Sequence, residues 1–451
     1  MVTDELANYY YRALERSDAF RFLNSHDILN GITDLSDGLR GLKGVTRPAS
    51  AGIYYNKVHN VHSKGELLTM EPPYTFAPTK AGEDIRTRFL DAQKLALDGH
   101  CLMDLSNVKL KDELRPKAKA LIGKTRAYES EGMLSYLMLK KFFGPIMQSF
   151  INNREILHHT GGIDFPTEFQ GLYRRLDRFP HITGRDHSNF DKTVQADLLL
   201  DVECVIAKMW VIAKDQGHFP HYTKEQLTNI AHGCMKYIIY SHEIVEGTYF
   251  VSQGAVNSGI LLTNWIDSTV IDLTQIYAIK ILYKEHYNGT RQFQSETIDG
   301  YPTLRSIHEH CDWISNGDDN LSTFDDLYYP FMSFSKVSAL LSEIFGMQCT
   351  PTTKGDTILE YGSWETETFC SRYFKGEFPF ITAALKKESI YRQFHWWKKN
   401  SVEEYIGQLF YSILPEAARW QDEAFYNTVL KNVNNIARQY DYHGCMALSY
   451  S

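Results

Sequence analysis

The spacing of apolar residues predicts two long helices in the middle of the chain. From residue 193 to 213, apolar side chains recur every three or four positions, as on one face of an α-helix, and Thr193 or Asp191 is suited to cap its start. Residues 260–284 predict a second helix, because 25 positions pass without Gly or Pro. The C-terminal 75 residues also read as helical, with a core formed by Trp396, Trp397, Leu409, Ile413 and Leu414.

Turn-forming residues mark shorter elements. Asn316-Gly317, which lies between two short apolar runs, predicts a tight β-hairpin. The small-residue segment 252–259 directly precedes the second predicted helix and can bend around a ligand. The first hundred residues mix Gly, Pro and short apolar stretches, which predicts irregular structure with short helices.

Composition describes a globular chain. With 451 residues it exceeds an average domain of about 100–200 residues, so we expect two or three subdomains. Seven scattered cysteines without a CxxC pair indicate neither a zinc site nor a disulfide framework and fit a reducing compartment. The first residues do not resemble a signal peptide, and the longest apolar stretch, 133–147, is too short to span a membrane.

Charge is segregated along the chain. The formal charge of −8 by itself argues against binding to nucleic acid. Residues 109–126, however, hold seven basic and two acidic side chains, a local charge of +5. A second basic cluster contains Lys386, Lys387, Arg392, Lys398 and Lys399. An acidic exterior around a basic channel therefore remains compatible with a nucleic acid partner.

Two pairs of acidic residues are candidates for a metal site. Asp318 and Asp319 follow the predicted hairpin turn, where they offer oxygen ligands to a hard cation such as Mg²⁺ or remain solvated. Asp186 and Asp191 form a second pair at a predicted strand-to-helix junction. Two metal ions bridged by carboxylates from separate strands are what an in-line phosphoryl transfer needs.

Two further segments supply groups for a nucleotide. Thr263 and Asp267 lie one helical turn apart, directly behind Ser258-Gly259, so that together they can read a ribose hydroxyl. Alternatively, they merely line a helix, with Asp267 as a surface charge. The basic run at 109–126 either surrounds a triphosphate or forms a solvated loop.

These segments together resemble a known family, the viral RNA-dependent RNA polymerases of the picornavirus-like supergroup. The resemblance covers residues 111–374 in the family's motif order: Lys111-Asp112-Glu113-Leu114-Arg115 with Gly123-Lys124-Thr125-Arg126 (motif F), Asp186-x4-Asp191 (A), Ser258-Gly259-x3-Thr263 (B), Gly317-Asp318-Asp319 (C), Thr350-Pro351-x2-Lys354 (D) and Phe369-Cys370-Ser371-Arg372-Tyr373-Phe374 (E). The remaining chain matches only by position.

The resemblance implies an α+β fold, a closed right hand with fingers, a palm of antiparallel sheet flanked by helices, and a helical thumb. The implied boundaries are fingers with fingertip segments at 1–180, palm at 181–200, a fingers insertion at 201–250, palm at 251–375 and thumb at 376–451. The implied activity is template-directed transfer of nucleotides from rNTPs to an RNA 3′-hydroxyl. Template and product RNA are the implied partners, with capsid or other viral replication proteins, in the host cytoplasm.

The resemblance also assigns roles to individual residues. Asp186, Asp318 and Asp319, with the His187 carbonyl, would hold two Mg²⁺ ions, for which Mn²⁺ can substitute. Lys354 would be a general acid for the leaving pyrophosphate. The triphosphate would be held by Lys111, Arg115, Lys119 and Arg126, and the ribose would be read by Asp191, Ser258, Thr263 and Asp267.

Two positions depart from the family pattern. Asp267 replaces the Asn of picornavirus polymerases, and the pattern Thr263-Asn264-x2-Asp267-Ser268 is more similar to polymerases of the partitivirus and picobirnavirus type. Asn316 replaces the aromatic or aliphatic residue that usually precedes Gly-Asp-Asp. Three alternatives remain: a reverse transcriptase, a catalytically inactive RNA-binding replication subunit, and a two-metal nuclease.

Overall fold

A computed structural model describes residues 1–32, 41–113, 117–287, 296–352, 358–395 and 401–441. At its centre is a four-stranded antiparallel sheet in the order β10-β11-β5-β12. Its strands are β5 (His181–His187), β10 (Cys311–Asn316), β11 (Asp319–Phe324) and β12 (Cys349–Pro351). The chain therefore brings segments more than 100 residues apart into one sheet.

The predicted hairpin is confirmed, with its turn displaced by one residue. Asn316 ends β10 and pairs with Asp319, so the two turn residues are Gly317 and Asp318. Gly317 has a φ of 64°, in the left-handed region that glycine adopts without steric cost. The turn thus presents Asp318 at its tip, and Asn316 becomes a strand residue.

Alternating side chains give the sheet two apolar faces, each covered by other elements. On one face, Trp313 belongs to the main core, and α11 (Thr263–Tyr287) and α13 (Phe334–Phe345) pack there. On the other, Ile314 and Leu321 join a second core with α7 (Phe165–Leu176). This second core also includes residues from β13 (Thr368–Phe369), β14 (Arg372–Lys375) and β15 (Thr382–Leu385).

Buried ion pairs and hydrogen bonds anchor β10 to the helices around it. Asp312 accepts hydrogen bonds from Arg175 Nε at 2.8 Å and Nη2 at 2.6 Å. Asp272 of α11 accepts from the Trp313 indole at 2.7 Å and from the Tyr10 hydroxyl at 2.5 Å. Because a buried carboxylate is costly unless it is paired, these contacts hold the strand in one position.

Both long helices predicted in the middle of the chain exist. Their main parts, α9 (Ala196–Asp215) and α11, each begin three residues after the predicted first residue. The first helix is divided into α8 (Phe190–Thr193) and α9, because Val194 and Gln195 have extended backbone conformations. The second, α11, begins at Thr263, after a loop whose Gly259 has a φ of 123°.

The N-terminal part is more helical than predicted. It contains α1 (Val2–Leu14) and the 18-residue α4 (Lys80–Leu97), so the prediction of short helices there was wrong for these two. Only a narrow apolar stripe marks α4, which made it hard to recognise. Shorter elements are α2 (Ser25–Asn30), β1 (Gly31–Ile32), β2 (Leu42–Lys43), α3 (Ile53–His59) and the 3₁₀ turn Lys64–Leu67.

A second four-stranded sheet lies beside these helices, in the order β4-β3-β6-β7. Its strands are β3 (Ser106–Leu110), β4 (Ala127–Ser130), β6 (His242–Val245) and β7 (Thr248–Val251). The neighbouring helices are α5 (Lys117–Leu121), α6 (Met133–Asn152) and α10 (Lys224–Ile239). A small hairpin and helix further along the chain are β8 (Thr297–Ile298), β9 (Tyr301–Pro302) and α12 (Leu304–His310).

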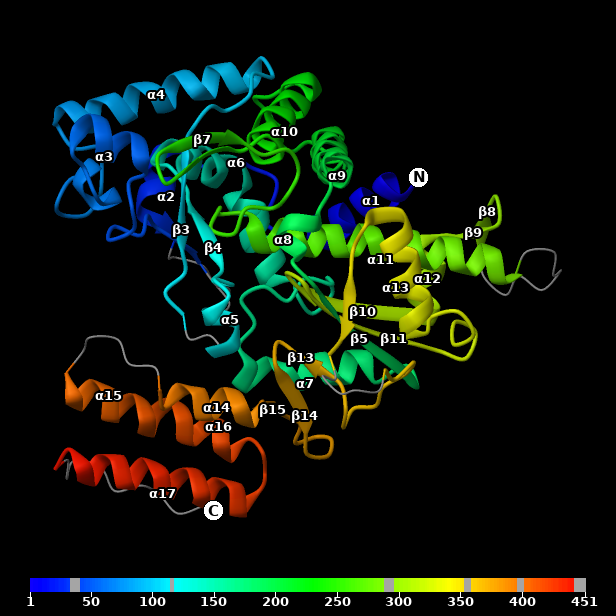
Figure 1. Cartoon of the computed structure of the whole chain (residues 1–451). Coiled ribbons are helices and arrows are strands. Elements are labelled where there is room, and N and C mark those ends of the chain that lie inside the picture. Colours follow the sequence, from blue (N-terminus) through cyan, green and yellow to red (C-terminus); the bar gives the residue numbers. More distant parts are fainter. Residues whose placement is uncertain (33–40, 114–116, 288–295, 353–357, 396–400, 442–451) are drawn as a thin grey trace.

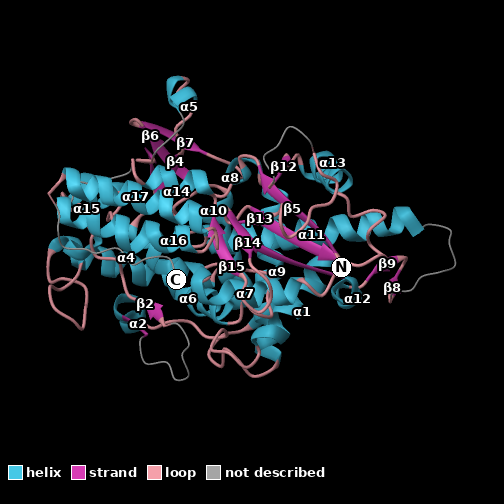
Figure 2. Ribbon diagram, turned by 90° about the horizontal axis from the view of Figure 1, so that it is seen from below, coloured by secondary structure: helices cyan, strands magenta, loops and turns pink. Residues whose placement is uncertain are grey.

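The C-terminal helices have a hydrophobic core of their own. Leu409, Ile413 and Leu414 are buried there as predicted, whereas Trp396 and Trp397 lie outside the described residues. The elements are α14 (Lys387–Gln393), α15 (Val402–Gln408), a π-helical turn (Leu409–Ile413), α16 (Leu414–Ala418) and α17 (Glu423–Gln439). Figures 1 and 2 both show this group on the opposite side of the central sheet from α12 and α13.

Candidate active site

The predicted acidic residues meet at one end of the central sheet. Asp186, next to the last residue of β5, lies directly opposite Asp319, the first residue of β11. Asn316 and Thr350 continue the same row on the outer strands. Side chains in one such row point to the same face of the sheet, so Asp186 and Asp319 are neighbours.

Negative charge accumulates around the hairpin turn. The tip of Asp318 is accessible to solvent, but the surrounding protein removes much of its water, and this desolvation together with Asp186 and Asp191 raises the pKa of Asp318. Asp267 is 8% exposed; burial, with Asp318 and Asp191 nearby, raises its pKa well above the ordinary value. The alternative of Asp267 as a surface charge is therefore wrong. Four acidic groups thus share a region that favours a bound cation.

The donors suit a hard divalent cation. Within the described residues, no three His, Cys, Asp or Glu side chains converge into a metal cage. Mg²⁺ is usually held by one or two carboxylates, with phosphates and water completing its shell, and the paired Asp186 and Asp319 beside Asp318 match that pattern. His187 is buried, and this burial lowers the pKa of its imidazole to about 3, so the ring is neutral.

The loop before α11 is held against β4. The Glu129 amide donates to the Ser258 carbonyl at 2.8 Å, and a Cβ added to Gly259 would lie 2.2 Å from the Glu129 carbonyl oxygen. Only glycine can take this position without displacing the strand. The Thr263 hydroxyl donates to the Asn257 carbonyl at 2.7 Å and closes the other end of the loop. The loop is thus fixed at both ends.

This loop also contacts the acidic and basic motifs. The amide of Val256 donates to the Asp191 carbonyl at 2.7 Å, which joins the loop to α8. Lys111 Nζ donates to Ser258 Oγ at 2.8 Å. Three of the predicted nucleotide-binding residues therefore lie in one connected region.

Among the other basic residues of the 109–126 run, Arg126 also faces the acidic cluster. Its guanidinium pairs with Glu113, with Nε 2.9 Å from Oε1, and this bond, with further effects of Asp318 and Asp191, raises the Arg126 pKa. Arg115 and Lys354 lie outside the described residues, as does the side chain of Lys119. Their predicted roles remain predictions.

Several contacts at the site are not predicted by the sequence. Ser268, fully buried on α11, accepts a hydrogen bond from the Gly317 amide at 3.0 Å. Asn264, one turn earlier, donates to the Asn316 side chain at 2.8 Å. Both contacts span about 50 residues of sequence, and neither follows from local spacing.

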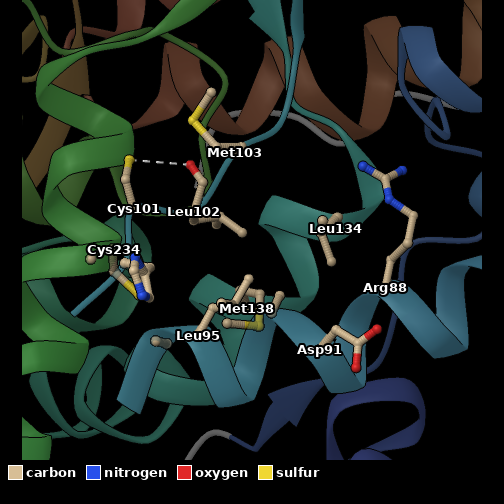
Figure 3. Close-up of a pocket in the computed structure, with 13 residues that line it drawn as sticks. Arg88, Asp91, Leu95, Cys101, Leu102, Met103, Leu134, Met138 and Cys234 are labelled. Carbon is tan, nitrogen blue, oxygen red and sulfur yellow. Dashed lines mark hydrogen bonds between the residues drawn. The ribbon is translucent and has the colours of Figure 1, made fainter. Parts of the chain in front are cut away.

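A separate pocket lies away from this region. It has a volume of about 250 Å³ between α4, α6 and α10, with Arg88 and Asp91 on α4 (Figure 3). Leu134, Met138 and Cys234 line it from the other two helices. It includes none of the residues predicted for the active site.

A solved structure with this fold is the Sicinivirus 3Dpol RNA dependent RNA polymerase, with a TM-score of 0.75 and 16% identity over 99% of this chain and 82% of that one. The profile of the viral RNA-dependent RNA polymerase family, RdRP_1, matches residues 102–436. The chain belongs to this family, as its motifs predicted.

Similar sequences occur in viral polyproteins. Polyprotein-FSD of Solenopsis invicta virus 3 is 23% identical over 438 residues, 96% of this chain. The genome polyprotein of Human rhinovirus 14 is 24% identical over 366 residues, 80% of this chain. The chain spans only 12% and 14% of the lengths of these two relatives. No helix in the described part of the chain is long and apolar enough to cross a membrane.

Proposed function

We propose that this chain is an RNA-directed RNA polymerase that adds ribonucleotides to an RNA 3′-hydroxyl. The observation that carries the proposal is the pairing of Asp186 with Asp319, with Asp318 in the adjoining turn. The partners are a template RNA, the growing product strand and rNTPs, with other viral replication proteins in the host cytoplasm. The similarity to viral polyproteins and to a viral polymerase structure supports a viral replication role.

We assign the cofactor to Asp186, Asp318 and Asp319, with the His187 carbonyl as a further ligand. Mg²⁺, for which Mn²⁺ can substitute, would activate the 3′-hydroxyl and neutralise charge on the phosphates. Desolvation, with the nearby charges of Asp186 and Asp191, raises the pKa of Asp318, and a divalent ion bound there would relieve the repulsion between these carboxylates, which supports this assignment. Oxygen donors also suit these ions better than softer metals.

The nucleotide would lie between the acidic turn and the basic motif. Lys111 and Arg126 would grip its phosphates, with Arg115 and Lys119. Lys111 now donates to Ser258, and Arg126 is paired with Glu113, so an arriving triphosphate would compete for both cations. Both cations are thereby kept near the site before the nucleotide binds.

The ribose would be read by groups on the loop before α11 and on α8. We assign this role to Ser258, Thr263 and Asp191, with Asp267 behind them. Because Ser258 lies on a loop fixed to β4, its hydroxyl is held in place before the sugar arrives. Burial and the nearby Asp318 and Asp191 raise the pKa of Asp267, which favours its protonated form, and a protonated carboxyl can donate as well as accept a hydrogen bond.

We propose the predicted subdomain boundaries on the basis of the two four-stranded sheets and the separate C-terminal core. The central sheet would be the palm, at 181–200 and 251–375. The separate C-terminal core supports a thumb at 376–451. The sheet containing β3 and β4 supports fingers at 1–180, with an insertion at 201–250.

The test is extension of a primed RNA template with Mg²⁺ and either rNTPs or dNTPs. We expect the protein to extend with rNTPs, and Asp318→Ala to lower the rate at least about 10³-fold because a metal ligand is lost. RNA binding should remain within about twofold. Asp91→Ala, an exposed change on α4, is the matched control and should extend normally.

Other outcomes would identify the alternatives. Preference for dNTPs would indicate a reverse transcriptase, and cleavage without nucleotides a nuclease. RNA binding without extension would indicate an inactive subunit. Extension by Asp318→Ala at the normal rate would remove Asp318 from the metal site.

A further inference from the structure

Asn316, which departs from the family pattern, connects two other motifs through its side chain. Its Oδ1 accepts a hydrogen bond from Asn264 Nδ2 at 2.8 Å, and its Nδ2 donates to the Cys370 sulfur at 3.1 Å. Asn264 lies in the first turn of α11, and Cys370 follows β13. One amide thus joins the helix that begins at the ribose-reading loop, the end of β10, and the turn between β13 and β14.

The third of these elements has a constrained backbone. Cys370 and Ser371 have φ values of 51° and 61°, so both turn residues adopt the left-handed conformation. Non-glycine residues pay a steric cost there and stay only where surrounding contacts hold them. The bond from Asn316 to Cys370 is one such contact, and it lies next to the catalytic turn.

Asn316 is also part of the carboxylate row. It pairs with Asp319, which in turn pairs with Asp186, so its amide lies on the same face as both acids. The turn itself is held by Ser268, which binds the Gly317 amide, and by Thr160, whose amide donates to the Ser315 carbonyl at 2.8 Å. These two bonds fix the turn from α11 and from the neighbouring loop. Asn316 adds the connection to the β13–β14 turn.

We propose that Asn316 is a positioning residue that sets the place of Asp318 and Asp319 relative to both the loop before α11 and the β13–β14 turn. This inference rests on the proposed polymerase function. The side-chain amide of Asn316 can accept from Asn264 and donate to Cys370 at once. Leu makes neither bond, and Asp would lose the donation and add a negative charge beside Asp319.

The first test is a kinetic comparison of Asn316→Leu, Asn264→Ala and the double variant on primed RNA. We expect each single change to lower kcat roughly tenfold, since loss of one or two neutral hydrogen bonds is of that order. The KM for the nucleotide should stay within about twofold, because phosphate and ribose contacts remain. The double variant should be no slower than Asn316→Leu, since both changes remove the same bond.

The second test does not depend on polymerase activity. Without RNA or nucleotide, the rate at which Cys370 is alkylated should fall severalfold in Asn316→Leu, because the amide that donates to its sulfur and lowers the thiol pKa is lost, so that less of the reactive thiolate forms. Exposed Cys204 is the internal reference and should label at an unchanged rate. Asn8→Leu, at an exposed site on α1, controls for the chemical change and should alter neither readout.

The outcomes separate the two proposals. If the wild-type protein fails to extend RNA, the polymerase proposal fails while the labelling of Cys370 still tests the bridge. If it extends, additive effects of the two single changes, or unchanged kcat and Cys370 labelling in Asn316→Leu, would overturn the role of Asn316. Should Asn316→Leu not fold, Asn264→Ala, at an exposed position, tests the same bond alone.

Discussion

At the scale of single residues, the structure shows burial and contacts of side chains whose surroundings the sequence does not define. Asp267 could be assigned to a helix face but not to the interior, where Asp318 and Asp191 act on it. The sequence places Ser268 on a helix but does not show its partner, the Gly317 amide, which donates a hydrogen bond to it. Both depend on α11 meeting the hairpin turn, which no local pattern encodes.

Lys354 is the residue whose predicted role most needs a direct test. We expect Lys354→Leu to slow incorporation by roughly 10²- to 10⁴-fold, the range of general acid catalysis, because the leaving pyrophosphate loses its proton donor. Nucleotide affinity should change much less. Single-turnover rates measured across nucleotide concentrations separate the two effects.

The control for this change is Lys336→Leu, which removes an exposed lysine of α13 from outside the site. If Lys354→Leu weakened nucleotide binding and left the maximal rate unchanged, the lysine would bind phosphate and would not act as an acid.

At the scale of elements, the loop before α11 depends on a buried carboxyl group. Burial, and then the neighbouring Glu243, raises the pKa of Glu129 to about 9. The same residue holds the Ser258 carbonyl through its backbone amide, and Asn257 donates to Glu243 at 3.1 Å. Ionisation of Glu129 would therefore place two negative charges under the loop.

A change to Glu129→Gln is expected to raise Tm by roughly 2–4 °C at pH 8, and by less toward pH 5. The unfolded chain loses this proton near pH 4.5, whereas the folded protein keeps it to about pH 9, so wild-type stability falls across this interval. Glutamine has no proton to lose and avoids that penalty. Thermal unfolding of both proteins from pH 5 to pH 10 measures the difference.

The pH dependence of the Tm difference between Glu129→Gln and the wild-type protein decides whether Glu129 is protonated in the folded state. A Tm difference that stayed constant over pH 5–9 would mean that Glu129 is ionised throughout. Glu225→Gln, on the exposed start of α10, serves as the control and should show no such trend.

Element boundaries illustrate what periodicity can predict. The repeat of apolar residues located α9, and the run of 25 residues without Gly or Pro located α11; each buries one face or more in the main core. Their first residues were missed because loop conformation, at Val194–Gln195 and at Gly259, decides where each helix begins. Helix α4 was missed because only a narrow stripe of its residues, including Ile85 and Phe89, is buried.

At the scale of the whole molecule, charge placement matters more than total charge. Lys109, Lys117 and Lys124 of the basic run are exposed, while acidic residues dominate the rest of the chain. Positive charge concentrated in one place attracts a polyanion even when the protein is negative overall.

Changing these three lysines to Gln should weaken single-stranded RNA binding and flatten its salt dependence. Each phosphate contact contributes roughly 0.7 to the slope of log K against log salt, so we expect the slope to decrease by about two. Fluorescence anisotropy titrations at salt concentrations between about 50 and 300 mM measure this slope, because phosphate contacts weaken strongly over this range.

Gln substitutions at Lys94, Lys224 and Lys336, three exposed lysines elsewhere, provide the matched control. An equal loss of slope in both triple variants would show that RNA responds to net charge and not to the basic run.

The sequence by itself determined the chemical inventory, the order of the motifs and the family. Spacing carried that information because Asp186 and Asp191, or Ser258 and Thr263, lie only five residues apart in one continuous segment. Only the tertiary structure decided that Asp186 faces Asp319, that Asp267 is buried beside the turn, and that Asn316 joins Asn264 to Cys370. Those relations arise where strands and helices distant in sequence meet, and close packing, not local propensity, selects their register.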